Sequence, residues 1–329
     1  MMAKLLEINN LHTYFETKRG LIKAVNGVSL SIEEGHTLGV VGESGSGKSQ
    51  TAMSILKLFE KNQKIYDGEI KFQGKVISNY NAKEMSKVRG NDISMIFQEP
   101  MTSLNPIFTV NRQISEVLML HQGMSKKEAE QHSIEMLKAV KIANPEQVNK
   151  SYPFQLSGGM RQRVMIAMAL ACKPKLLIAD EPTTALDVTI QAQILYLMNE
   201  LKREMGTSIM FITHDLGVIN QMADDVAVMY CGQVVETAPV DKIFQDSEHI
   251  HPYTEGLLTS IPRLNTDRSS KLEVIPGAVP HPLNLPKGCK FAPRCKYATA
   301  ECRENEPELK EVSPGHAIRC FHPVKRGKQ

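Results

Sequence analysis

The chain has 329 residues and a formal net charge of +3, and 42% of its residues are hydrophobic. This balance is ordinary for a soluble globular protein, and it argues against a nucleic-acid-binding surface. No apolar run approaches the roughly 18 residues that cross a bilayer, and residues 1–10 contain no signal-peptide segment. We therefore expect a cytosolic protein with one large domain and a smaller appendage, unless a partner holds it at a membrane.

Strand and helix patterns alternate from residue 4 to about residue 245. Residues 39–41 predict the end of a buried strand, and a helix is expected from Lys48 to Leu58. Further strands are expected at residues 93–97, 176–179 and 208–213, with a helix before the last of them. The fully apolar strand at 176–179 is typical of a strand buried on both faces. The alternation predicts an α/β domain with a mostly parallel core sheet. We also expect a small antiparallel β part in this domain.

A helical insertion interrupts this alternation. Residues 124–140 have a helical pattern, and Ser125 and Glu128 form a capping-box sequence at its start. We expect a helical subdomain at about residues 99–160. Beyond residue 245, several prolines argue against long regular elements. The sequence therefore predicts two parts, which are residues 1–246 and a small C-terminal extension at 247–329.

A glycine-rich loop occupies residues 42–49, which read Gly-Glu-Ser-Gly-Ser-Gly-Lys-Ser. They fit the phosphate-binding pattern G-x-x-x-x-G-K-[ST], and they lie between a predicted strand and a predicted helix. The glycines let successive main-chain N–H groups face one anion, and the helix N-terminus adds partial positive charge. Lys48 is expected to reach the β- and γ-phosphates of ATP, and Ser49 to bind Mg²⁺. The expected ATP-binding residues of this loop are Gly42, Ser44, Gly45, Gly47, Lys48 and Ser49.

Two acidic residues, Asp180 and Glu181, end the strand predicted at 176–179. Alone they would be read as solvated acids at the end of a strand. Together with a phosphate loop they predict an ATPase, in which Asp180 holds Mg²⁺ and Glu181 acts as the general base toward water.

Residues 156–160, Leu-Ser-Gly-Gly-Met, look like the signature motif of ABC transporter ATPases. The chain resembles this family, and the resemblance implies that Ser157, Gly158 and Gly159 contact ATP held by a second subunit. Position 160 is usually Gln in the family pattern, whereas here it is Met. The phosphate-contacting residues are unaffected by this departure, so an active pair of ATPases is expected.

The other motifs of the family follow in the family's order. Gln98 sits where the family has the Q-loop glutamine, which links Mg²⁺ and water to the membrane domain. Asp187 closes a sequence that resembles the D-loop, and His214 resembles the switch histidine that contacts the γ-phosphate. Phe15 sits where an aromatic residue stacks on adenine, although its neighbour Tyr14 is an alternative. The resemblance therefore assigns catalysis to Glu181, His214 and Gln98.

Several further segments resemble di- and oligopeptide importers and their nickel-importing relatives. They are residues 98–106, 160–163, 251–254 and 275–277, and the match is to the D-type ATPase subunit. The resemblance implies a second, non-identical ATPase, two transmembrane permeases and an extracellular peptide-binding protein. The chain would then lie at the cytoplasmic face of the cell membrane, with residues 101–105 gripping a permease helix. A nickel or small-solute importer, and a non-transport soluble ABC ATPase, remain alternatives.

Four cysteines lie close together in the last part of the chain. They are Cys289, Cys295, Cys302 and Cys320. Four thiolates on a small proline-rich segment suggest a metal that stabilises it. The spacing lacks the Cys pairs, about two to four residues apart, of common zinc sites, and it leaves the metal open. Resemblance to the peptide importers implies a [4Fe–4S] cluster, with zinc or no metal as alternatives.

Overall fold

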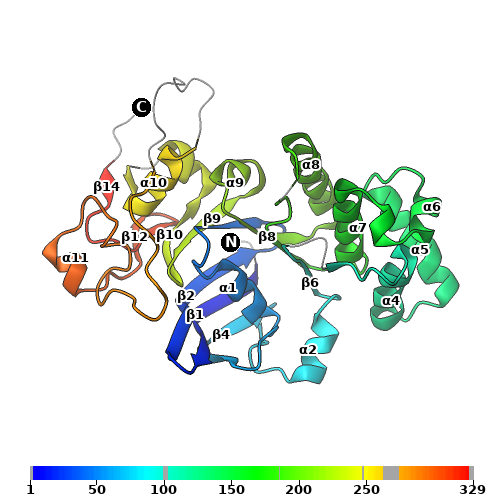
Figure 1. Cartoon of the computed structure of the whole chain (residues 1–329), viewed down its shortest axis with the longest axis horizontal. Helices are drawn as coiled ribbons and strands as arrows, with labels where there is room; N and C mark the ends of the chain where they lie inside the picture. Colours follow the sequence, from blue (N-terminus) through cyan, green and yellow to red (C-terminus); the bar gives the residue numbers. More distant parts are fainter. Residues whose placement is uncertain (1–2, 99–102, 185, 247, 262–273, 326–329) are drawn as a thin grey trace. The chain divides into compact units, whose positions relative to one another are not determined.

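A computed structural model gives the fold (Figure 1), and it describes residues 3–98, 103–184, 186–246, 248–261 and 274–325. Contacts within the chain divide it into two compact units. The first unit contains residues 3–5, 32–36 and 79–212, and the second contains 6–31, 37–78 and the described residues from 213 onward. Part of the predicted permease contact, residues 101–102, lies outside the described residues.

The first unit combines a short parallel sheet with helices. Its helices are α2 (Ala82–Val88), α4 (Val110–Gln122), α5 (Lys126–Ala139), α6 (Pro145–Lys150), α7 (Gly158–Leu170) and α8 (Val188–Met205), and its strands are β6 (Ile93–Ile96), β7 (Leu176–Asp180) and β8 (Ser208–Thr213). Strand β7 pairs in parallel with β6 on one side and with β8 on the other. All five residues of β7 are buried, as its continuous apolar sequence predicts.

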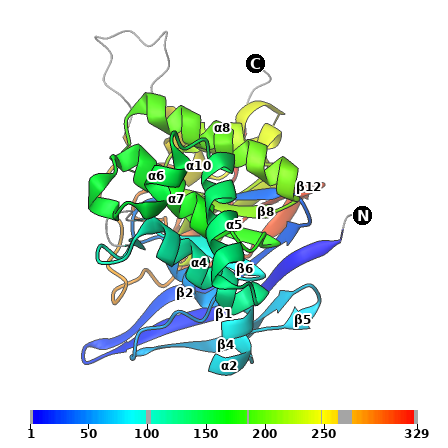
Figure 2. The ribbon, with the colours of Figure 1, turned by 90° about the vertical axis from the view of Figure 1, so that its right-hand side faces the viewer.

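The helical part of the first unit is built around α5, which contacts α4, α6 and α7 (Figure 2). Ser125 caps α5, because its side chain accepts a hydrogen bond from the main-chain N–H of Glu128 while the Glu128 carboxylate accepts from the N–H of Ser125. This confirms the capping box predicted from the sequence.

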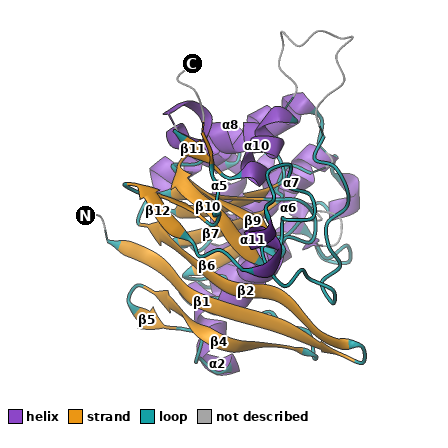
Figure 3. Cartoon of the chain, turned by 90° about the vertical axis from the view of Figure 1, so that its left-hand side faces the viewer, coloured by secondary structure: helices purple, strands orange, loops and turns teal. Residues whose placement is uncertain are grey.

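The second unit contains two groups of strands and several short helices. Its helices are α1 (Lys48–Ile55), α9 (Leu216–Met222), α10 (Pro252–Thr259) and α11 (Ala300–Glu304), and its strands are β1 (Lys4–Thr17), β2 (Gly20–Glu33), β3 (Thr37–Val41), β4 (Gln63–Phe72), β5 (Lys75–Val76), β9 (Asp225–Tyr230), β10 (Gln233–Pro239), β11 (His249–Ile250), β12 (Lys310–Ser313), β13 (His316–Ile318) and β14 (Val324–Lys325). Strands β2, β1, β4 and β5 lie side by side in that order (Figure 3), and β4 is antiparallel to both β1 and β5. Strand β3 pairs in parallel with β9, and β9, β10, β13 and β12 follow as antiparallel neighbours.

Most of the elements expected from the sequence are present. Helix α1 ends earlier than predicted, at Ile55, because the chain turns at Lys57 into a left-handed conformation with φ of 49°. The larger difference follows residue 246, where the short strands β12 and β13 extend the antiparallel group beside β10. Strands of three or four residues leave too few positions for an alternating apolar pattern to be recognised. Among the described residues, no helix has both the length and the apolar character needed to cross a bilayer.

Candidate functional site

The glycine-rich loop connects buried strand β3 to helix α1 in the second unit. Gly42 has a φ of 154° and Gly47 a φ of 99°, values that side-chain-bearing residues rarely adopt. A Cβ atom at Gly42 would collide with the main-chain carbonyl of Met229, and one at Gly47 with that of Ala24. The glycine positions of the sequence pattern are therefore required by the path of the chain.

Lys48 lies against the loop that precedes it, with its side chain buried. Its Nζ donates hydrogen bonds to the carbonyl oxygens of Gly42 at 2.7 Å and Glu43 at 3.1 Å. These bonds hold the ammonium group inside the curve of the loop. Ser44 and Gly45 are exposed and Ser49 is half-buried in the first turn of α1. The structure thus brings the predicted phosphate-binding residues of the loop together around one concave backbone segment.

Phe15 and Tyr14 occupy opposite faces of β1, because side chains alternate along a strand. The face of Phe15 is turned toward α1, since the Thr13 hydroxyl is hydrogen bonded to that of Ser54 in α1 at 2.9 Å. Tyr14 is buried on the other face, where its hydroxyl donates to Asn26 at 2.8 Å and burial raises its pKa. Phe15 therefore lies on the side of the loop helix, whereas Tyr14 is engaged elsewhere.

A pocket adjoins the phosphate loop in the second unit. Its lining combines the loop, strand β2 and a segment of the C-terminal part of the chain, and the residues are Ile22, Lys23, Ala24, Gly45, Gly47, Gln50, Cys231, Gly232, Pro280, Pro282 and Leu285. Gln50 also accepts a hydrogen bond at 2.7 Å from Gln63, the residue that pairs with Phe15 across β1 and β4. The pocket and the face that carries Phe15 therefore share Gln50.

The acidic pair belongs to the first unit. Asp180 is buried at the end of β7, and Glu181 follows with a left-handed φ of 45°. Such a conformation is costly for a residue with a side chain, by about 1–3 kcal/mol, and it is concentrated at functional sites. The Glu181 Oε2 atom accepts hydrogen bonds from the Gln98 amide at 3.0 Å and from the Thr184 hydroxyl at 3.0 Å. The structure therefore brings Gln98 and Glu181 together, and Thr184 joins them.

The signature sequence forms the start of α7, also in the first unit. Ser157 is the N-cap of this helix, and its hydroxyl accepts a hydrogen bond from the N–H of Met160 at 3.3 Å. Ser157 and Gly158 are exposed, so the amides at this helix N-terminus are open to an anion. Gly159 packs close to Ile190 of α8, whose N-cap is Asp187. The signature sequence thus lies beside the start of α8, which directly follows the predicted D-loop.

The Asp187 carboxylate accepts a hydrogen bond from the N–H of Ile190 at 2.9 Å. This residue therefore has a local structural role as a helix cap in addition to the role predicted for it. His214 belongs to the second unit and is exposed directly after β8, ahead of α9. Ala185 of the predicted D-loop lies outside the described residues.

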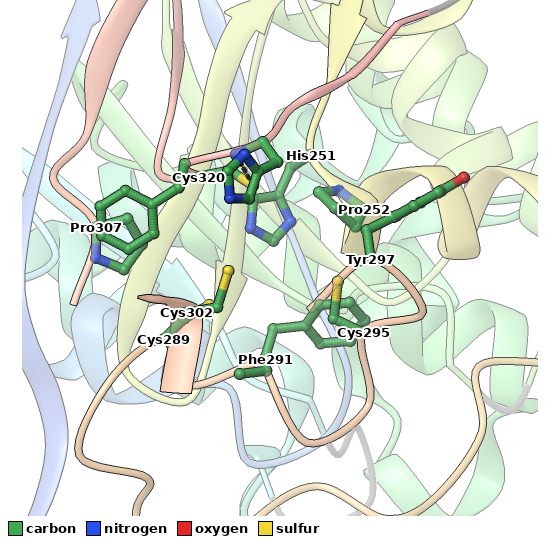
Figure 4. Close-up of a pocket in the computed structure, with 12 residues that line it drawn as sticks. His251, Pro252, Cys289, Phe291, Cys295, Tyr297, Cys302, Pro307 and Cys320 are labelled. Carbon is green, nitrogen blue, oxygen red and sulfur yellow. Dashed lines mark hydrogen bonds between the residues drawn. The ribbon is translucent and has the colours of Figure 1, made fainter. Parts of the chain in front are cut away.

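Four cysteines of the second unit line a single pocket, as Figure 4 shows. They are Cys289, Cys295, Cys302 and Cys320, and His251, Phe291, Tyr297 and His322 also line it. Burial raises the pKa of Cys289 and Cys295, and it raises the pKa of Cys320 to about 12. These three thiols are therefore protonated at neutral pH unless a metal displaces the protons. Among the described residues, no three His, Cys, Asp or Glu side chains are placed to hold a metal ion.

Comparison with known proteins identifies the family of this chain. The family model for "ABC transporter" matches residues 25–184, and the model for "Oligopeptide/dipeptide transporter, C-terminal region" matches residues 235–302. The oligopeptide transport ATP-binding protein AppD of Bacillus subtilis is 56% identical over 97% of both chains. The chain belongs to the oligopeptide transport ATP-binding proteins of the ABC transporter family. A second member, OppD of Salmonella typhimurium, is 52% identical over 97% of this chain and 94% of its own.

A solved structure shares the fold of this family member. The ATP-binding cassette MJ0796, a dimer bound to ADP and Pi, aligns with a TM-score of 0.64 at 30% identity, covering 71% of this chain and 98% of its own. The chain therefore has the P-loop ABC ATPase fold, with its mixed sheets and helices.

Three contacts at the site of this oligopeptide transport ATP-binding protein were not foreseen from its sequence. Thr184 binds Glu181, and Tyr253 and Arg294 both bind Glu43 of the phosphate loop. Thr184 could have been suspected because it lies three residues after Glu181. Tyr253 lies in the segment 251–254 that resembles the peptide importers, but nothing near Tyr253 or Arg294 in the sequence signals a contact with the loop, because they approach it only through the folding of the C-terminal part of the chain.

Proposed function

We propose that the chain is the ATP-hydrolysing subunit of an ABC importer that takes up di- or oligopeptides. Membership of the family carries this proposal: relatives 56% and 52% identical over nearly the whole chain are named oligopeptide transport ATP-binding proteins. The second family model, for the C-terminal region of oligopeptide and dipeptide transporters, supports a peptide cargo over nickel. An ABC ATP-binding subunit of this family is an ATPase.

The loop amides and Lys48 are assigned to the triphosphate of ATP, and Phe15 to the adenine. The orientation of Phe15 toward α1, with Tyr14 turned away and hydrogen bonded, supports this choice. Ser49, Gln98 and Asp180 supply hydroxyl, amide and carboxylate oxygens, which is a donor set that Mg²⁺ prefers. When bound, Mg²⁺ neutralises charge on the phosphates.

Glu181 is assigned as the general base and His214 as the contact to the γ-phosphate. The carboxylate of Glu181 is oriented by the Gln98 amide and the Thr184 hydroxyl. A positioned carboxylate can accept a proton from water, which contributes typically 10²–10⁴-fold to a rate. The exposed position of His214 leaves it accessible to nucleotide.

A second, non-identical ATPase subunit is proposed as the partner of this chain. Ser157 and Gly158 are exposed at the N-terminus of α7, and Val188 beside Asp187 is 84% exposed. These groups suit an interface in which the signature motif and Asp187 contact ATP that is bound by the partner. The dimeric state of the related cassette MJ0796 supports this arrangement.

Two permeases and an extracellular peptide-binding protein complete the proposed importer, with this chain at the cytoplasmic face of the membrane. Phe97, Ile107 and Phe154 expose apolar side chains on the first unit, with Ile107 71% and Phe154 65% exposed. Phe97 directly precedes Gln98. A permease helix that contacts Phe97 would therefore be one residue away from the proposed ATPase site. Exposed large apolar side chains mark an interaction surface where they gather into one patch, which is what the proposed docking site requires of these three.

Residues 247–329 are proposed as the extension typical of peptide importers, following an ABC domain at 1–246 with its helical subdomain at about 99–160. The four-cysteine pocket is proposed to hold a [4Fe–4S] cluster, with zinc as the alternative. A cluster binds one thiolate at each of four irons, whereas zinc needs four sulfurs around a single point. Four cysteines that line one pocket supply the thiols for the first arrangement, whereas in the part of the chain that the structure describes no three such side chains surround a single point. Anaerobically purified protein should then be brown and bleach on reduction, whereas colourless protein with stoichiometric zinc would identify the alternative.

The ATPase assignment is tested by Glu181→Gln, with Glu200→Gln as the matched control. The Glu181 variant should bind ATP with normal affinity and hydrolyse it at least 100-fold more slowly, because the amide cannot accept a proton. Glu200 lies on α8 outside the predicted motifs, and its variant should hydrolyse ATP normally. Full turnover by the Glu181 variant would remove this residue as the base. Co-purification of the tagged chain with membrane permeases tests the transport assignment, and recovery of the chain without them from detergent-solubilised membranes would count against it.

A further inference from the structure

Arg294, from the C-terminal part of the chain, reaches the phosphate loop. Its two terminal nitrogens donate hydrogen bonds to the two carboxylate oxygens of Glu43, at 2.6 and 3.1 Å. Glu43 directly follows Gly42, the first glycine of the loop. A guanidinium that binds both oxygens of a carboxylate fixes its orientation as well as its position. One side chain of the loop is therefore held by a residue about 250 positions further along the chain.

The surroundings of Arg294 make this contact strong. Its side chain is 5% exposed, whereas that of Glu43 is 32% exposed. The Arg294 Nε donates to the carbonyl oxygen of Pro276 at 3.0 Å, and one terminal nitrogen lies 3.4 Å from the Tyr230 hydroxyl. A buried charge is costly without a partner, so Glu43 is required to balance this arginine. The pair also raises the pKa of Arg294 above its ordinary value.

A second contact holds the main chain at the same residue. The N–H of Glu43 donates to the Tyr253 hydroxyl at 2.8 Å, and Tyr253 is fully buried. The ring of Tyr253 packs against those of Tyr230 and Phe291, with centroids 4.7 and 5.4 Å away. The carbonyl of Glu43 meanwhile accepts from Lys48. The side chain, amide and carbonyl of this one loop residue are thus all fixed.

Arg294 and Tyr253, which both bind Glu43, are connected to the four-cysteine pocket. Arg294 immediately precedes Cys295, and its own N–H donates to the carbonyl of Phe291 at 2.9 Å. Phe291 and Cys295 line the pocket, and Phe291 packs on Tyr253. One route from the pocket to Glu43 therefore passes through the Arg294 side chain, and the other passes through the aromatic rings.

We propose that this part of the chain clamps the phosphate loop: Arg294 and Tyr253 position Glu43, and they transmit the packing of the four-cysteine pocket to the affinity of the loop for ATP. Arg294 acts in two ways. It fixes the shape of the loop, and it neutralises a carboxylate that would otherwise stand unpaired beside the phosphates. The inference needs ATP binding at the loop, as the proposed function does, but it needs no particular occupant of the pocket.

Substitutions of Arg294 and of Glu43 should change the Kd for ATP by different amounts. Arg294→Met leaves a carboxylate without its partner at the loop, so the Kd for ATP should rise roughly tenfold or more. Glu43→Gln keeps one side-chain oxygen that Arg294 can bind and leaves a cation at the loop, so it should weaken ATP binding less than Arg294→Met does. The double variant Arg294→Met/Glu43→Gln should recover part of the wild-type affinity, because it removes the unpaired carboxylate but does not restore the clamp. A fluorescent ATP analogue titrated into the full chain measures all three.

Two controls separate this role from simple loss of stability. Arg319→Met removes another partly buried arginine of the same region, one that binds the carbonyls of Val234 and Pro307 rather than the loop. It should lower the unfolding temperature without changing the Kd. Arg294→Lys keeps the charge without the paired hydrogen bonds, and should give an intermediate Kd. An unchanged Kd in both Arg294 variants, or a double variant no better than Arg294→Met, would overturn the clamp.

Hydrogen exchange tests the link to the pocket. A non-hydrolysable ATP analogue should slow exchange in residues 289–298 of the wild-type chain, because coupling between two sites is reciprocal. The same analogue, at a saturating concentration, should have little effect on that segment in Tyr253→Phe/Arg294→Met. Equal protection in both proteins, or none in the wild type, would overturn the link. Wild-type protein that binds no ATP at all would instead contradict the proposed function.

Discussion

Acid should destabilise the protein through one buried histidine, His251. Its side chain is 1% exposed, and burial lowers its pKa to about 3. The Nδ1 atom accepts a hydrogen bond from the N–H of Tyr253 at 3.0 Å, which caps α10 and requires this nitrogen to be unprotonated. The folded state therefore binds fewer protons than the unfolded state. The stability that this histidine contributes is complete above pH 6.5 and is lost as the pH falls toward 3.

The size of the effect follows from the unfolded pKa of about 6.5. Between pH 7 and pH 5, protonation of this histidine in the unfolded state should lower the free energy of unfolding by roughly 2 kcal/mol. His251→Asn keeps a side-chain oxygen that can cap the helix but does not titrate. Denaturant unfolding of both proteins at pH 7 and pH 5 measures the difference, since all other groups are shared. A variant that loses as much stability as the wild type on acidification would refute the reasoning.

Three further substitutions test the nucleotide site, each by titration with a fluorescent ATP analogue or by an ATPase assay. Gly42→Ala should raise the Kd for ATP at least tenfold, because a Cβ there meets the Met229 carbonyl. The control Gly74→Ala, where a Cβ meets nothing, should leave the Kd unchanged. Equal affinity in both variants would contradict the required loop shape. Phe15→Ala should lose roughly 1–3 kcal/mol of binding, the value of an aromatic ring stacked on a base, while Tyr14→Phe should lose none; the reverse pattern would reassign the adenine contact. Ser157→Ala should leave ATP binding by the same chain intact but slow hydrolysis in the complex with its partner, and normal hydrolysis there would argue against a shared site.

The parts of the site that the sequence predicted are those whose chemistry is local. The phosphate loop needs glycines, Lys48 and a following helix within eight residues, so its geometry is set by one short segment. The same holds for the acidic pair after β7 and for the capping box at α5. Each of these features can be recognised without knowing what lies elsewhere in the fold.

The parts that were not predicted depend on contacts between distant residues. Arg294 and Glu43 are separated by 251 positions, and no pattern near either residue signals the other. The proposed choice of Phe15 over Tyr14 likewise rests on the pairing of β1 with β4 and on the contact of Thr13 with α1, which no local pattern reveals. The strands β12 and β13 are likewise too short to be recognised from the sequence. They form because β13 pairs with the edge of β10.

Peptide uptake tests the central claim most directly. Cells that produce either the wild-type chain or Glu181→Gln are given labelled di-, tri- and pentapeptides, with nickel measured alongside. The account predicts that the variant abolishes uptake of at least one peptide length class and leaves nickel uptake unchanged. Unchanged uptake of every peptide with loss of nickel uptake would contradict the peptide assignment, and no change in either would contradict a role in import.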